Sequence, residues 1–265
     1  MADQKTIQDL ETILTWEGEV DNARIRDVLN VKPVWASRLL GELVQHMGTR
    51  AKRASAHAPL TFADQKFNGS PDDYLQIVGG SEFIEDARLD ISSLQPELFS
   101  KVIQATRRSR GLRISYRSMT NPLGSERVVF PHAIVRVSRR WHMRAWCESR
   151  KEFRDFTLGR ISEIEYFDAP SPKERDGDRD WVEKVNITVI AHPALTYEQQ
   201  EMIRAEYFPK AAARRLTLRR CLADYVLRDL HIATDMEKHL PPEYQLAVAK
   251  SELSNKASAI LWHFP

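Results

Sequence analysis

Cationic side chains are concentrated in one stretch near the middle of the 265-residue sequence. Residues 139–161, RRWHMRAWCESRKEFRDFTLGRI, hold six arginines, two tryptophans and one histidine. Across residues 101–160, fifteen Lys and Arg residues stand against four Asp and Glu residues, so local carboxylates can neutralise only part of the positive charge. Guanidinium groups are forked hydrogen-bond donors that suit phosphate and other planar anions. Because clustered like charges repel one another, this stretch predicts an acidic partner.

The direction of these side chains follows from the alternation of a β-strand, in which every second residue points to the same face. In residues 140–147, RWHMRAWC, one alternate set is apolar throughout and predicts the core. That set is Trp141, Met143, Ala145 and Cys147. The other set, His142, Arg144 and Trp146, is expected to face outward.

Neighbouring strands add polar side chains to the outward face. The resulting concave patch would combine Tyr116, Ser118, His132, Arg144 and Arg154. Its forked donors and hydroxyl groups suit a phosphate or another planar anion. The alternative is that the arginines pair with local acids such as Glu148, Glu152 and Asp155.

Short strands must position this patch, because the hydrophobic period changes from helical to two after Leu112. Five strand candidates follow in tight succession, at residues 112–119, 126–138, 140–147, 152–158 and 160–167. Such a succession predicts a small barrel or a strongly bent sheet over residues 111–170. A helical connector is expected at 63–110, and the polar, Pro- and Asp-rich residues 168–180 predict a domain boundary. Residues 183–265 predict a small α/β module.

The first fifty residues predict three helices, with a tight connection between the second and the third. This spacing is typical of a helix-turn-helix unit, and the basic segment that follows would form a wing, giving a DNA-binding domain at residues 1–62. The alternatives are a plain helical bundle and, for Trp35, a place in the core. The candidate DNA-binding residues are Lys32, Trp35, Ser37, Arg38, Arg50, Lys52 and Arg53.

Several classes of protein are not expected from this sequence. No apolar run is long enough for a membrane span, and no signal-peptide core is present at the N-terminus. His132, His142 and His192 lack the spacing of a zinc site, and no phosphate-cradling P-loop is found. We therefore expect no enzyme, cofactor or metal. Cys147 and Cys221 are expected to be buried free thiols of a cytoplasmic protein.

The run from residue 113 to residue 161 resembles the WYL domain of bacterial transcription regulators. The similarity rests on the strand order, the Pro131-His132 pair, Arg144 and the ending FRDFTLGRI, and it spans residues 96–168. The Trp-Tyr-Leu signature stands here as Trp141-His142-Met143, so two of its three residues differ. The resemblance implies an Sm-like β-barrel whose basic pocket senses a nucleotide or nucleic-acid-like effector. By matching position, the pocket residues would be Tyr116, Ser118, His132, Arg144 and Arg154, with Arg160 added.

Together these observations predict an α+β protein with a winged helix-turn-helix, a central Sm-like barrel and a C-terminal α/β module for dimerisation. In architecture the chain resembles the WYL repressors found beside phage-defence operons, which act as homodimers. We expect a homodimer that binds an inverted-repeat operator in double-stranded DNA and responds to an anionic effector. One alternative is a single-strand-binding module that stacks bases on Trp146, Tyr116 and Phe156. Another is a protein-interaction adaptor.

Overall fold

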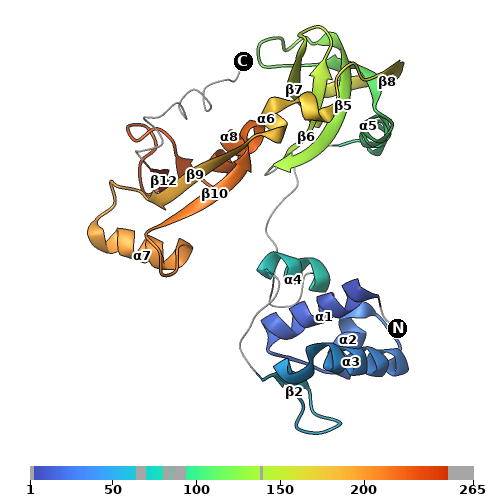
Figure 1. The fold of residues 1–265 in the computed structure, drawn as a ribbon, viewed down its shortest axis with the longest axis vertical. Helices are drawn as coiled ribbons and strands as arrows, with labels where there is room; N and C mark the ends of the chain where they lie inside the picture. The colour runs from blue at the N-terminus through green and yellow to red at the C-terminus, as the bar shows by residue number, and fades with distance from the viewer. Residues whose placement is uncertain (1–2, 64–69, 80–83, 85–93, 138–139, 250–265) are drawn as a thin grey trace. The chain divides into compact units, whose positions relative to one another are not determined.

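The computed structural model forms two compact units, Met1–Arg88 and Leu89–Pro265 (Figure 1). The structure describes residues 3–63, 70–79, 84, 94–137 and 140–249. Part of the expected connector and the last sixteen residues of the expected C-terminal module lie outside these ranges. Within the described residues, no helix has the length and apolar character needed to cross a membrane.

Within its described residues, the first unit consists of three α-helices, a small antiparallel sheet and a fourth α-helix. Its elements are α1 (Gln4–Glu17), β1 (Glu19–Val20), α2 (Asn22–Leu29), α3 (Pro33–Met47), β2 (Ala51–Lys52), β3 (Leu60–Phe62) and α4 (Pro71–Val78). The strands form an antiparallel sheet in the order β1-β3-β2. The three helices expected from the sequence are therefore present, and a two-stranded hairpin follows them.

Capping residues set the helix boundaries in the first unit. Asp3 and Asp21 accept hydrogen bonds from the backbone N–H groups of Thr6 and Arg24, at 2.7 Å each, and so begin α1 and α2. Gly18 ends α1 in the left-handed region at φ 80°. The buried faces of α1 and α3 meet β3 in one core, whose fully buried side chains include Leu10, Ile13, Leu14, Ile25, Leu39, Leu43 and Leu60.

A five-stranded antiparallel sheet forms the first part of the second unit (Figure 1). It follows α5 (Pro96–Arg108) and consists of β4 (Arg110–Tyr116), β5 (Ser125–Val137), β6 (Arg140–Cys147), β7 (Glu152–Thr157) and β8 (Ile161–Pro170). The strand order is β7-β6-β5-β4-β8, so β7 and β8 lie at the edges. No pairing between these two strands is found among the described residues, and a closed barrel is therefore not observed there.

Alternation on β6 supplies the core of this sheet, as predicted. Met143, Ala145 and Cys147 are fully buried, and Trp141 packs against the same cluster. Helix α5 covers this face with Val102 and Ala105.

A second, mixed sheet occupies the C-terminal part of the unit, with the strand order β10-β9-β12-β11. Its elements are α6 (Arg179–Val182), β9 (Lys184–Ala191), α7 (Tyr197–Tyr207), β10 (Ala213–Arg219), α8 (Ala223–Asp229), β11 (Ile232–Ala233) and β12 (Leu246–Val248). The expected α/β character of this part is confirmed. Cys147 is a buried free thiol, whereas Cys221, which was also expected to be buried, is half-buried.

Candidate functional site

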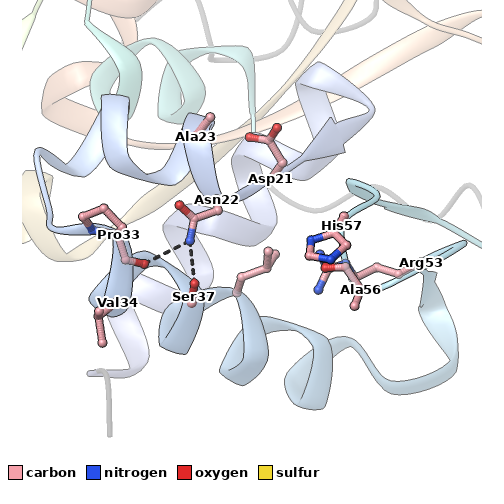
Figure 2. A pocket seen from close by; sticks show the side chains of 10 residues that line it. Asp21, Asn22, Ala23, Pro33, Val34, Ser37, Arg53, Ala56 and His57 are labelled. Carbon is pink, nitrogen blue, oxygen red and sulfur yellow. Dashed lines mark hydrogen bonds between the residues drawn. The ribbon is translucent and has the colours of Figure 1, made fainter.

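A groove of ≈ 600 Å³ opens in the first unit between the start of α3 and the loop that joins β2 to β3. Figure 2 shows Asn22, Pro33 and Ser37 on the helix side of this groove and Arg53 and His57 on the loop side. Nδ2 of Asn22 donates to the carbonyl oxygen of Pro33 at 3.0 Å and to Oγ of Ser37 at 2.7 Å. These bonds fasten the start of α2 to the start of α3 and fix the helix wall of the groove.

The candidate residues at the start of α3 are exposed. Trp35 is 40% exposed, so the alternative that it belongs to the core is wrong. The guanidinium of Arg38 lies over the Trp35 ring, 4.9 Å from its centroid, and its Nε donates to Glu42 Oε1 at 3.0 Å. Lys32 and Ser37 are exposed beside them. The structure therefore leaves all four candidates exposed at the start of α3, with Arg38 stacked on Trp35 and Ser37 turned toward Asn22.

The three basic residues after α3 have different environments. Nη1 of Arg50 donates to Oε1 of Glu11 at 2.7 Å, and Glu11 is buried in the helical core. Arg53 donates to the carbonyl oxygens of Ala56 and Ala58, at 2.6 and 2.8 Å, and so shapes the β2–β3 loop. Lys52 is exposed. Arg50 thus ties the segment before the hairpin to α1.

Arg144 lies in a buried ion cluster of the second unit. Its Nε and Nη2 donate to the two carboxylate oxygens of Asp178 at 2.7 and 2.9 Å, and Nη1 lies 3.4 Å from Asp155. Arg144 is 5% exposed and Asp178 is 1% exposed. Nε2 of His132 lies 2.9 Å from the same Asp178 carboxylate. Asp178 therefore binds both His132 and Arg144 in the way that an anionic ligand would.

The cluster carries one guanidinium between two carboxylates. Burial raises the pKa of Asp178, but hydrogen bonds from Arg144 and His132 outweigh burial and lower this pKa to about 2. Burial raises the pKa of Asp155 more than the nearby Arg144 lowers it. Burial by itself lowers the pKa of Arg144, yet the two carboxylates raise it overall. Arg144 and Asp178 are therefore both charged at neutral pH.

The strand face expected to point outward is covered in the structure. His142 is 6% exposed, and its ring lies 5.0 Å from that of Tyr225 on α8. The ring of Trp181 on α6 lies 5.4 Å from His132, and Tyr225 Oη donates to Asp155 at 3.5 Å. The expectation that this face meets solvent is therefore wrong for His142 and Arg144. Alternation assigns a residue to one side of a sheet, but it does not show what a later part of the chain places there.

Among the described residues, the remaining four candidate pocket residues form no hydrogen bond or ion pair with Asp178. Arg154 is opposite Ala145 in the register, on the other face of the sheet from Arg144, and lies 3.3 Å from Glu152. Oη of Tyr116 accepts from the backbone of Thr157 at 3.3 Å. The Ser118 hydroxyl accepts from a backbone N–H in the turn after β4, and the half-buried Arg160 lies between β7 and β8.

Of the six candidates, His132 and Arg144 alone share an ion cluster. Sequence reasoning missed Asp178, Trp181 and Tyr225. Asp178 lies in the acidic segment after β8, and that segment's charge is the signal that could have pointed to it.

Comparison with known proteins identifies two families. Residues 97–166 match the WYL domain, and residues 184–254 match the BrxR transcriptional regulator, C-terminal dimerization domain. The chain is 27% identical to the DNA-binding transcriptional repressor CapW of Escherichia coli strain KTE188, over 94% of this chain and 89% of that protein. It is also 27% identical to CapW of Pseudomonas aeruginosa, over 92% of this chain and 88% of that protein.

A solved structure of proteasome accessory factor B/C of Arthrobacter aurescens aligns with a TM-score of 0.30 and 17% identity, over 65% of this chain and 28% of that chain. That score is too low to support an argument about the fold. The two family matches do support the expected domain order, because the WYL match covers the central sheet and the BrxR match covers the C-terminal module. The chain therefore carries matches to a WYL domain and to a BrxR-type C-terminal dimerization domain, and over nearly its whole length it is similar to transcriptional repressors named CapW.

Proposed function

We propose that this chain is a homodimeric transcriptional repressor that binds duplex DNA through its first unit. The observation that carries the proposal is the exposure of Lys32, Trp35, Ser37 and Arg38 at the start of α3, where Ser37 also lines the groove. A helix of this kind fits the major groove of DNA, and its first residues contact base edges. The hairpin of β2 and β3 is the wing in this reading, and Lys52 on it reaches a phosphate.

Dimerisation follows from the need for specificity. One helix-turn-helix contacts few bases, so discrimination against competing genomic sites requires two units on an inverted repeat. The C-terminal residues that match the BrxR dimerization domain provide the second contact in this proposal. The CapW proteins, which are similar over nearly the whole chain, are DNA-binding transcriptional repressors by name. Control of a phage-defence operon is part of the same proposal.

An anionic, nucleotide-like effector is the proposed signal, and the WYL domain is its receptor. Its support is the pair His132 and Arg144, because their shared carboxylate partner, Asp178, marks an anion-binding position. Closure of the central sheet into an Sm-like barrel belongs to this proposal as well. Its support is the strand order, in which β4, the first strand, pairs with both β5 and β8.

The single-strand-binding alternative is disfavoured by the geometry of its stacking residues. Phe156 is buried, and the Tyr116 ring packs edge-on against it at 5.1 Å. Trp146 is partly buried, and its Nε1 donates to Glu148 at 3.1 Å. Such a platform offers no row of open aromatic faces for bases.

Operator binding by matched arginine variants tests the proposed function. The DNA is the region upstream of the chain's own gene, and the assay is gel shift with footprinting at fixed salt. Arg38→Ala should lower affinity by about tenfold or more, as expected for loss of a base contact. Arg107→Ala, an exposed arginine on α5, is the control and should bind as the wild type does. Equal affinities of all three proteins would contradict DNA recognition by α3, and displacement of the duplex by an unrelated single strand would favour the alternative.

A further inference from the structure

The Asp178 carboxylate of the chain occupies the anion-binding position proposed above for the WYL domain. We propose that Asp178 is a built-in anion that occupies the effector position, so that an incoming phosphate-like anion and Asp178 compete for Arg144. This inference rests on the proposed function, because it assumes that an anion is the signal. The inference names Asp178 as the group that competes with the effector, and it gives a path by which effector binding alters the dimerization domain.

The contacts of Asp178 are those of a bound oxyanion. Two guanidinium nitrogens of Arg144 donate hydrogen bonds to its two oxygens, in the forked geometry that arginine also offers to phosphate. His132 adds a third donor to the same carboxylate. A phosphate group presents acceptor oxygens of the same kind and can accept all three bonds. An exchange of one anion for the other therefore keeps the buried guanidinium paired, which avoids the large cost of an unpaired buried charge.

Unpaired buried polar atoms on the elements that carry Arg144 and Asp178 or face them point independently to a ligand. Nδ1 of His132, Nδ1 of His142 and Nε1 of Trp181 are buried and have no hydrogen-bond partner in the part of the chain that the structure describes. His142 and Trp181 are themselves more than nine-tenths buried. A buried polar atom without a partner costs free energy, and each such atom in a folded protein calls for an explanation. A ligand with polar edges as well as a phosphate, such as a nucleotide, would satisfy them.

The position of Asp178 in the chain connects the site to the C-terminal module. Asp178 caps α6 through the N–H of Trp181, and α6 leads directly into β9 of the C-terminal sheet. Arg219 at the end of β10 donates to the carbonyl oxygen of Trp181, and its guanidinium lies 4.4 Å from the centre of the Trp181 ring. Displacement of Asp178 therefore loosens contacts that β9 and β10 make with α6. The effector changes the dimer only if it binds the two arrangements with different affinity, and competition with Asp178 supplies that difference.

The test uses the full-length protein, with inorganic phosphate as the probe and sodium chloride at equal ionic strength as the control for screening. Calorimetry measures the binding of phosphate, and hydrogen–deuterium exchange measures the protection of residues 175–183. Phosphate should raise exchange in this segment of the wild type. Asp178→Asn should raise it without phosphate and should bind phosphate at least about tenfold more tightly, because a neutral amide holds Arg144 less strongly than a carboxylate does. Asp176→Asn, an exposed carboxylate two residues away, should match the wild type.

Each contrary outcome has a separate meaning. Phosphate binding of equal strength in the wild type and Asp178→Asn, or no binding to either, overturns the competition. If Asp178→Asn does not unfold cooperatively, the wild type decides alone: phosphate that binds without raising exchange in residues 175–183 also overturns it. Operator binding is measured separately and without phosphate. If the protein does not bind the operator, the proposed repressor function is rejected, but the result of the competition experiment still stands.

Discussion

The ion cluster of the second unit predicts an asymmetry between two single substitutions. Arg144 is the shared cation of Asp155 and Asp178, at 3.4 and 2.7 Å. Arg144→Met leaves two buried carboxylates facing each other without that cation, and loss of one member of a buried pair costs about 3–5 kcal/mol. Asp178→Asn leaves Arg144 beside Asp155 and weakens two charge-assisted hydrogen bonds, which costs about 1–3 kcal/mol. We therefore expect Arg144→Met to be the more destabilising change, by about 2 kcal/mol.

Urea unfolding at pH 7 and fixed protein concentration measures both free energies, with Trp fluorescence and circular dichroism as parallel probes. In a unit of this size, a difference of about 2 kcal/mol corresponds to a shift in Tm of roughly 4–8 °C. The double variant should be less destabilised than the sum of the two single variants, because it removes both charges of one pair. Equal losses for the two single variants, or additive losses in the double variant, would contradict the view that one arginine serves two carboxylates.

The same cluster predicts how this stability changes with pH. The folded-state pKa of Asp178 is lowered from 3.8 to about 2, so the folded protein binds fewer protons there than the unfolded chain. Its contribution is therefore complete above pH 3.8 and is lost as the pH falls towards 2. The stability difference between the wild type and Asp178→Asn should shrink across that range. A difference that grows on acidification would refute the assignment of Asp178 as the ionised partner.

The remaining predictions concern both units. Arg50→Ala should destabilise the first unit by about 1–3 kcal/mol, because it deprives the buried Glu11 carboxylate of a charged partner; thermal unfolding measures this. Lys52→Ala should leave that stability unchanged and reduce the slope of log affinity against log salt by about 1, as measured by DNA titrations. Burial and the charges of Arg140 and Arg160 lower the pKa of His142 from 6.5 to about 4, so stability should fall as the pH drops from 6.5 towards 4. His142→Gln should flatten this part of the profile in urea unfolding at successive pH values.

Features fixed by local periodicity could be predicted, whereas features fixed by distant segments could not. The apolar set on β6 follows from alternation, and Met143, Ala145 and Cys147 are buried as predicted. The face of α3 follows from helical periodicity, which leaves Arg38 accessible. The pairing of Arg50 with Glu11 joins residues 39 positions apart, and the pairing of Arg144 with Asp178 joins residues 34 positions apart. No pattern within one element encodes either pair.

The charge distribution along the chain did indicate a partner for the arginines, in a segment outside the strands that carry them. Residues 161–186 carry eight acids against four bases, directly after the strongly basic stretch, and Asp178 is one of these acids. The acidic partner predicted for the arginines is thus, for Arg144, supplied by the same chain. A tethered carboxylate acts at a high effective concentration, of millimolar order or more for a short tether. A lone phosphate should therefore bind the wild type weakly, and an effector that competes at cellular concentration needs further contacts. The unpaired atoms of His132, His142 and Trp181 are where we expect those contacts to form.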